Sequence, residues 1–295
     1  MRIALVGLCQ VVGMGDALKS LFPEAVIKHR HIKRNSEMQQ AIADSLPSYD
    51  LVITQFQDHH DMPLFTEGRL LEAGVPRVEV VPPFIFRGFH PDSCLISGVP
   101  QTPIEAFHSK ILSAAFSLGL PLDRAIMLFN KLVYKRLGYF EEFSSSRSSL
   151  MASYEPYGYD VIVERDWDLW LKGGAFMHTP LHPNVRVLSS LATFAVERSG
   201  IAPYEITPPS DVVDVFDQQH AWPFYTELAE EIGMSGDYTF RNYARNVAED
   251  GDRFIQLVEF SKKSYEIFER SSRSAIDNDP GVIEGRDVLR DIIVN

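Results

Sequence analysis

The residue of this chain best suited to nucleophilic chemistry is Cys9, which stands in "VGLCQVVGMG" at residues 6–15. There an apolar run gives way to a glycine-bearing segment. A cysteine reacts as the thiolate or fills space as a small apolar side chain, and its surroundings decide which. If a helix begins near Asp16 and directs its N-terminus toward Cys9, its partial positive charge favours the thiolate. Both roles are therefore open from the local sequence.

A cysteine nucleophile is activated by a neighbouring proton acceptor, and His90 and His182 are the two candidates for that role. His90 lies in "FRGFHPDSC", a turn-like segment that also holds Arg87 and Asp92. His182 lies in "FMHTPLHPN", directly before a long amphipathic segment. Asp92 could reach an imidazole from another loop. The residue types alone leave the base role divided between the two histidines.

A basic segment, "KHRHIKRN" at residues 28–35, stands out in an otherwise acidic chain. Arg30, Lys33 and Arg34 are candidate phosphate contacts, although runs of charge more often form a solvated face. The formal net charge of −12 argues against broad binding to nucleic acid, whose backbone would be repelled. A small anionic ligand held by the basic segment remains compatible with this charge.

The first hundred residues alternate between strand-like and helix-like segments. Near-continuous apolar runs between helical patterns are typical of a parallel sheet that helices cover on both faces, which gives an α/β fold class with a flavodoxin-like core. In such a sheet, ligands bind outside the carboxyl ends of the strands, and Cys9 falls at such an end. The expected strands lie at 2–8, 25–32, 50–56 and 77–86, and the expected helices at 16–22, 36–46 and 62–74.

From about residue 101 the pattern becomes helical. Segments at 103–120, 122–138, 139–154 and 160–173 carry apolar residues at helical spacing. We therefore expect a core over residues 1–200, with a helical insertion at about 101–172, and a helical C-terminal extension over 201–295 that packs on the core. The aromatic stripes of that extension, over 224–234 and 238–276, are typical of packing or of self-association into a homo-oligomer.

Composition and motif spacing indicate the redox state, the location and the excluded ligands of the protein. Neither of the two cysteines sits in a C-x-x-C spacing, so we expect two reduced thiols and no metal. No apolar run approaches the roughly 20 residues that cross a bilayer, and the start of the chain does not read as a signal peptide. The sequence thus predicts a cytoplasmic location. Gly7, Gly13 and Gly15 do not form G-x-G-x-x-G, which disfavours a dinucleotide site.

Several segments resemble known families. "HPNVRVLSSLATFAVE" looks like the last sequence block of the SGNH hydrolases, in which a histidine precedes a helix. More closely, four segments in the same order resemble the WcbI-like family of capsular polysaccharide-biosynthesis proteins, over roughly residues 1–200. These segments are "GLCQ", "ITQ", "PPFIFRGFHPD" and "FMHTPLHP".

The SGNH resemblance assigns roles within a catalytic centre. It implies that Cys9 takes the place of the nucleophilic serine, His182 that of the catalytic histidine, and Gln55 that of an oxyanion-hole amide. Backbone N–H groups after Cys9 and the amide of Gln10 would add further donors. Thr179 stands where the superfamily has an acid, but a thiol, already partly ionised near neutrality, depends less than serine on a histidine fixed by a carboxylate.

The WcbI-like resemblance implies binding of coenzyme A and acetyl transfer from acetyl-coenzyme A to a saccharide. The basic segment and Arg87 would then hold the phosphates, while His90 would hold the acceptor or the pantetheine. The runner-up enzyme is a cysteine-dependent esterase or thioesterase. A third hypothesis is a non-catalytic module that binds coenzyme A or a nucleotide sugar, with Cys9 buried. An accessible Cys9 near a histidine favours an enzyme.

Overall fold

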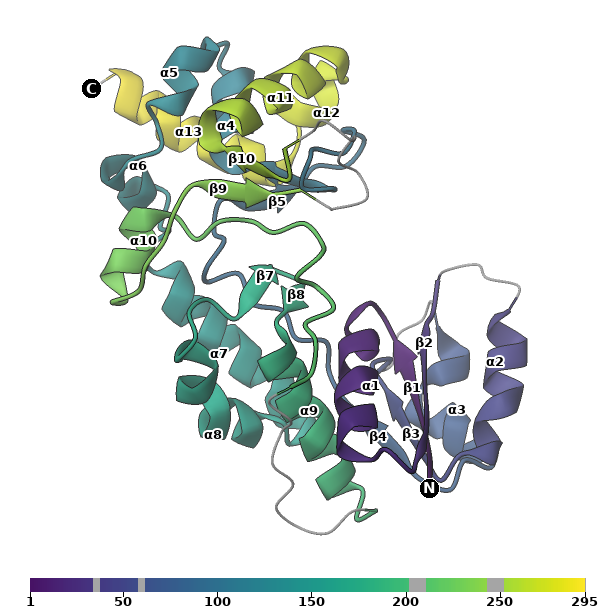
Figure 1. The fold of residues 1–295 in the computed structure, drawn as a ribbon. Helices are drawn as coiled ribbons and strands as arrows, with labels where there is room; N and C mark the ends of the chain where they lie inside the picture. The colour runs from purple at the N-terminus through teal and green to yellow at the C-terminus, as the bar shows by residue number, and fades with distance from the viewer. Residues whose placement is uncertain (34–37, 58–61, 202–210, 243–251, 295) are drawn as a thin grey trace. The chain divides into compact units, whose positions relative to one another are not determined.

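The computed structural model describes residues 1–33, 38–57, 62–201, 211–242 and 252–294 (Figure 1). Within them the chain forms two compact units, each built from three stretches. Unit 1 holds 1–85, 148–177 and 181–216, and unit 2 holds 86–147, 178–180 and 217–295. The units therefore interleave along the chain, whereas the sequence suggested two consecutive regions that divide at residue 200.

Unit 1 is built on a four-stranded sheet in the order β2–β1–β3–β4, in which every pairing is parallel. This confirms the α/β fold class. The strands are shorter than the apolar runs because each run continues into the loop at the carboxyl end of its strand. Their bounds are β1 Arg2–Gly7, β2 Val26–His31, β3 Leu51–Thr54 and β4 Val78–Val80.

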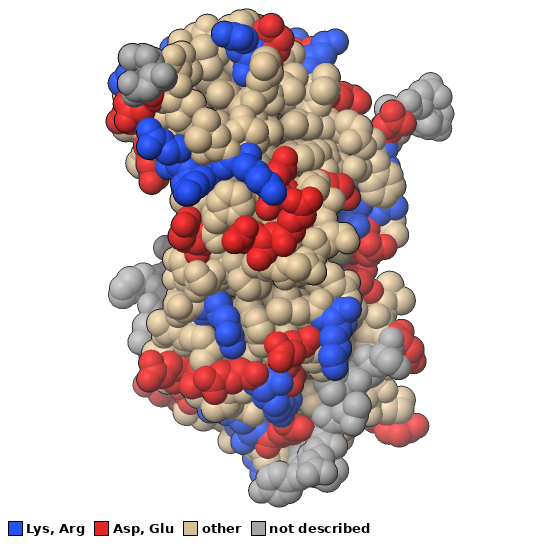
Figure 2. Space-filling view, turned by 90° about the vertical axis from the view of Figure 1, so that its left-hand side faces the viewer, with Lys and Arg blue, Asp and Glu red and all other residues tan. Residues whose placement is uncertain are grey.

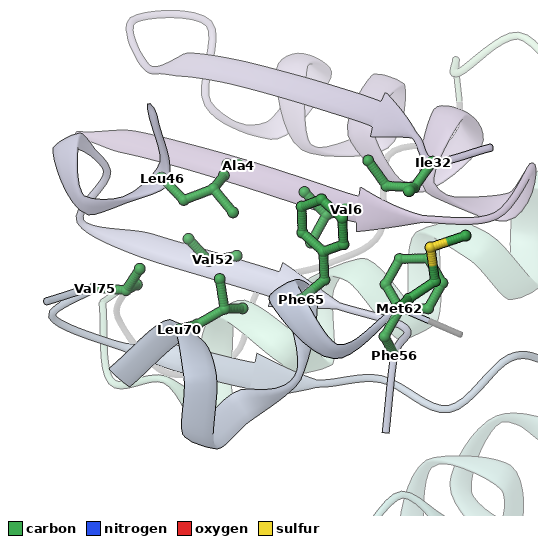
Figure 3. Packing of buried hydrophobic residues seen from close by; sticks show 10 residues of the cluster. All are labelled: Ala4, Val6, Ile32, Leu46, Val52, Phe56, Met62, Phe65, Leu70 and Val75. Carbon is green, nitrogen blue, oxygen red and sulfur yellow. The ribbon is translucent and has the colours of Figure 1, made fainter. Parts of the chain in front are cut away.

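Alternation along the strands gives the sheet two apolar faces. Ala4, Val6 and Val52 belong to one buried cluster, which Figure 3 shows between the sheet and the segments that carry Phe65 and Leu70. The intervening residues of β1, such as Leu5, are equally buried and turn to the opposite face. On the first face lie α2 (Gln39–Ser45), the short helices η1 (Leu46–Ser48) and η2 (Pro63–Phe65), and α3 (Glu67–Glu72).

The opposite face is covered by α1 (Gln10–Leu21), against which α9 (Val185–Arg198) packs. A side chain at Gly13 would place its Cβ 2.5 Å from Leu188 Cδ1, and one at Gly15 would lie 2.8 Å from His29 Cδ2. These two glycines are therefore required by close packing of α1 on α9 and on β2.

The rest of unit 1 packs aromatic side chains behind the sheet. The second half of α7 (Glu142–Tyr154), η3 (Glu155–Tyr157) and α8 (Asp160–Leu171) supply most of this layer. Phe84 makes edge-to-face contacts with Tyr154, Trp170 and Phe176, at ring-centroid distances of 6.0, 5.5 and 5.9 Å. Such contacts fix the chain segment that follows β4.

Unit 2 consists of short helices and antiparallel hairpins. The hairpins pair β5 (Ser93–Leu95) with β6 (Phe107–Ser109) and β9 (Thr239–Arg241) with β10 (Phe254–Gln256). A further two-stranded pair joins β7 (Met177–Thr179) and β8 (His182–Pro183), and β8 belongs to unit 1. The helices of unit 2 are α4 Lys110–Ser117, α5 Leu122–Ile126, α6 Lys131–Arg136, α10 Thr226–Glu231, α11 Leu257–Arg270, α12 Arg273–Asp277 and α13 Pro280–Val294.

Three expected helices are corrected by the structure. The first begins at Gln10 rather than near Asp16, because the glycines there serve helix packing. The segments 103–120 and 238–276 contain strands β6, β9 and β10, whose aromatic residues fit either pattern.

No helix in the described part of the chain is long and apolar enough to cross a membrane. On the face drawn in Figure 2, basic and acidic side chains form small groups of both signs.

Candidate functional site

Cys9 caps the N-terminus of α1, two residues beyond the end of β1. It is half-buried and forms no disulfide. The N–H groups of Val11 and Val12 donate to the carbonyls of Leu8 and Cys9, both at 3.3 Å. Gln10, the first helical residue, has no carbonyl in the same helix to accept its N–H. That N–H and the partial positive charge of the helix end lie beside the thiol and favour negative charge there.

The side chain of Gln10 is a buried clamp. Its Nε2 donates to the carbonyls of Phe84 (2.9 Å) and Leu181 (2.8 Å). Its Oε1 accepts from the N–H of Phe84 (3.0 Å) and from Nε2 of Gln55 (3.1 Å). Both amide hydrogens of Gln10 are thus used within the protein, so its predicted role as an oxyanion donor would require one of these bonds to break. Gln10 holds two chain segments next to Cys9.

Gln55 shapes the turn that leads into Cys9. It directly follows β3, is 3% exposed, and accepts the N–H of Leu8 at Oε1 (3.1 Å). A Cβ on Gly7 would stand 2.6 Å from this Oε1 and 2.5 Å from Val11 Cγ1, so Gly7 leaves the room that the amide needs. Gln55 is therefore bonded to Leu8 and Gln10, the two residues that flank Cys9, and its role as an oxyanion-hole amide stays a prediction.

His182 belongs to the same neighbourhood as Cys9 within unit 1. The residue before it, Leu181, is the one whose carbonyl Gln10 binds. The half-buried imidazole stacks on Phe216 with ring centroids 4.5 Å apart. Asn184 then caps α9, accepting the N–H groups of the second and third helical residues at 3.1 and 3.4 Å. The H-P-N segment thus sets both the position of the histidine and the start of the helix.

His90 and Asp92 lie in unit 2 and are both buried. Burial lowers the pKa of His90 to about 3, so the imidazole is neutral near pH 7. Asp92 accepts from the hydroxyls of Tyr139 (2.9 Å) and Tyr225 (2.8 Å), and from the N–H of Ile111 (3.0 Å). Burial raises the pKa of this carboxyl. These bonds give Asp92 a structural role in unit 2, and its role as an orienting carboxylate stays a prediction.

The remaining candidates are basic. Arg87 is exposed in unit 2 and donates to the carbonyl of Ser93 at 3.1 Å. Arg30 and Lys33 are exposed and line a cleft of about 660 Å³ between the end of β2 and α2, together with His31 and Gln39. We call this the basic cleft. Arg34 lies outside the described residues.

The basic cleft and Cys9 occupy neighbouring strands of one sheet edge. Gly7 pairs with His31 in the register of β1 and β2, and the N–H of Ile32 donates to the carbonyl of Gly7 at 2.8 Å. Adjacent strands lie about 4.8 Å apart. Within the described residues, no group of three or more His, Cys, Asp or Glu side chains is arranged to hold a metal ion.

Comparison with known proteins identifies the family. The family model described as "Polysaccharide biosynthesis enzyme WcbI" matches residues 2–204. The chain belongs to the WcbI family. A solved structure of WcbI, described as a novel polysaccharide biosynthesis enzyme, matches with a TM-score of 0.77 at 13% identity, over 97% of this chain and 98% of that one. It is described as the native protein without a disulfide bond between coenzyme A and one of its cysteines. A search of curated proteins found no match.

Membership in the WcbI family identifies the chain as a polysaccharide biosynthesis enzyme by family name. Two features of the candidate site were not predicted from the sequence. Phe216, which stacks on His182, lies far from it along the chain, so no motif connects the two. The clamp function of Gln10 depends on Phe84 and Leu181, which are 74 and 171 residues away along the chain.

Proposed function

We propose that this protein is a coenzyme A-dependent O-acetyltransferase that acts on a saccharide in capsular or exopolysaccharide biosynthesis. The family name supports a role in polysaccharide biosynthesis, and the description of the WcbI structure names coenzyme A together with a cysteine, as a pair without a disulfide bond, which supports coenzyme A as the ligand proposed here. The order of the parallel strands is compatible with an SGNH-like core. One observation carries the proposal: Cys9 and the basic cleft share the carboxyl edge of the sheet, on adjacent strands.

The proposed reaction has two balanced steps. The Cys9 thiolate attacks the carbonyl carbon of acetyl-coenzyme A, the carbon–sulfur bond to coenzyme A breaks, and the coenzyme A thiolate leaves and takes up a proton. A saccharide hydroxyl then attacks acetyl-Cys9 and passes its proton to His182, and the Cys9 thiolate leaves. The backbone N–H of Gln10 would stabilise the oxyanion in both steps, as the N–H after a nucleophile does in related catalytic turns.

Phosphate recognition supports the assignment of the basic cleft. Arg30 and Lys33 would neutralise the phosphates of coenzyme A, whose negative charge gains most from such contacts at low ionic strength. Replacing Arg30 and Lys33 together by Gln is expected to weaken binding of acetyl-coenzyme A at least tenfold, or about 1.4 kcal/mol. S-acetylpantetheine, which carries no phosphate, should bind the variant and the natural protein equally. Equal weakening of both ligands contradicts this assignment.

Intact-protein mass spectrometry tests the covalent step. After incubation with acetyl-coenzyme A, we expect one acetyl adduct on a peptide that contains Cys9. Cys9→Ser should give no thioester adduct, whereas Cys94→Ser should behave as the natural protein, since burial raises the pKa of the Cys94 thiol. His182→Gln should still acquire the adduct but release it slowly to a saccharide. Saccharide acetylation without any adduct refutes the covalent mechanism, and release of acetate to water alone favours the esterase or thioesterase alternative.

A further inference from the structure

A second cleft lies at the carboxyl edge of the sheet and differs in character from the basic cleft. Its volume is about 320 Å³. Its lining residues belong to the segments after β3 and β4 and to α7. We call it the neutral cleft, and its walls are Gln57, Pro82, Pro83, Ile85, Ser149 and Ser153, with Leu150 beneath them.

The strand order places Cys9 between the two clefts. The basic cleft adjoins β2, Cys9 follows β1, and the neutral cleft adjoins the ends of β3 and β4. In the order β2–β1–β3–β4, the nucleophile therefore has a cation-lined cleft on one side and an uncharged one on the other. Such an edge can receive two different ligands at one reacting atom.

Hydrogen bonds join the wall of the neutral cleft to Gln10, the residue after the nucleophile. Gln10, which follows Cys9, binds both the N–H and the carbonyl of Phe84, at 3.0 and 2.9 Å. Phe84 is the residue between Pro83 and Ile85, two walls of the neutral cleft. Gln10 therefore holds the backbone of Phe84, and with it the two adjoining wall residues, next to Cys9.

The neutral cleft is preformed. The hydroxyl of Tyr154 on α7 donates to the carbonyl of Pro82 at 3.0 Å, which ties the helix to the segment after β4. Leu150 is 2% exposed and forms the floor, and its carbonyl accepts from the hydroxyl of Ser153 at 2.8 Å. A ligand that enters this cleft therefore meets walls already in place, which lowers the entropic cost of binding.

The walls of the neutral cleft match an uncharged, hydroxyl-rich ligand. Gln57 offers an amide and Ser149 a hydroxyl, which can donate to and accept from sugar hydroxyls, and the Ser153 hydroxyl, whose hydrogen goes to Leu150, can accept from them. Pro83 and the half-exposed Ile85 offer apolar surface to sugar C–H groups. Among the residues that the structure describes, none of those that line this cleft is charged. A charged ligand would lose hydration there without gaining an ion pair.

We propose that the neutral cleft binds the saccharide acceptor and selects for a neutral sugar over an acidic one. This inference rests on the proposed function, since it assigns the second substrate of the same nucleophile. It adds a specificity-determining surface formed by Gln57, Ser149 and Ser153.

Saturation-transfer NMR with methyl hexopyranosides, and with the corresponding hexuronic acids as charged probes, tests the proposal without any turnover. The natural protein should bind at least one neutral glycoside and bind its uronic acid at least tenfold more weakly. Ser149→Trp should fill the cleft and abolish this signal. Ser148→Trp changes an exposed serine one position away on α7 that does not line the cleft, and it should retain binding.

Mass spectrometry separates this proposal from the proposed function. Ser149→Trp should still form acetyl-Cys9 from acetyl-coenzyme A but deliver it to a neutral glycoside at least tenfold more slowly, whereas Ser148→Trp should deliver it normally. If the natural protein forms no adduct, the proposed function fails, while glycoside binding is still read by NMR. Binding lost equally in both variants, uronic acids bound as well as neutral sugars, or no glycoside bound at all overturns the assignment of the cleft.

Discussion

Removal of the Gln10 clamp should destabilise unit 1 by several kilocalories per mole. In Gln10→Ala, the carbonyls of Phe84 and Leu181, the N–H of Phe84 and the amide of Gln55 lose their partner. A typical neutral hydrogen bond contributes about 1 kcal/mol net, and a buried group left without a partner costs about 1–3 kcal/mol. Three backbone groups and one side chain therefore predict a loss of about 4 kcal/mol. The whole free energy of unfolding of a folded domain is only about 5–15 kcal/mol.

Urea unfolding followed by tryptophan fluorescence can isolate this effect. In a Trp222→Phe background, the remaining tryptophans, Trp167 and Trp170, both lie in unit 1. Gln40→Ala is the matched control, because Gln40 is an exposed glutamine of α2 bonded to a single carboxylate, and it should change stability by less than about 0.5 kcal/mol. A loss below about 1 kcal/mol in Gln10→Ala would refute the clamp.

Three further predictions follow from individual residues. Gly7→Ala should cost about 1–3 kcal/mol in urea unfolding, because its Cβ would meet Val11 at 2.5 Å, and adding Val11→Ala should recover part of the loss. His90→Gln should make the free energy of unfolding less dependent on pH below pH 6.5. The pKa of His90 is about 3 in the folded protein and 6.5 in the unfolded chain, so the unfolded chain binds the proton first. The natural protein therefore loses stability as the pH falls from 6.5 toward 3. Relative to the variant, the natural protein should lose about 2 kcal/mol between pH 7 and pH 5, and parallel profiles contradict this. Iodoacetamide at pH 7 should label Cys9 in intact-protein mass spectra faster than Cys94, which is also half-buried but whose thiol pKa is raised by desolvation, so equal labelling contradicts the assigned environments.

The sheet of unit 1 was predictable because its signal is local. Strands β1 and β3 are apolar runs that end in polar or glycine residues, and parallel pairing follows from the helical segments between the strands. The position of Cys9 at the carboxyl edge follows from the same pattern. The start of α1 was not predictable from the same signal, because Gly13 and Gly15 weaken the helical propensity of a segment that packing on Leu188 and His29 makes helical.

The candidate site was only partly predictable because residue type does not reveal hydrogen-bond partners. Gln10 and Gln55 are both amides next to a nucleophile, and a motif assigns them the same role. Their hydrogen bonds differ in the structure, since Gln10 donates both amide hydrogens to backbone carbonyls whereas Gln55 donates one to Gln10. A carbonyl of the main chain has no sequence signature, so its demand for a donor is invisible until the fold brings Phe84 and Leu181 together. The division of labour around Cys9 is therefore a property of tertiary structure, and substitution of Gln10 tests positioning where a motif would have led one to test catalysis.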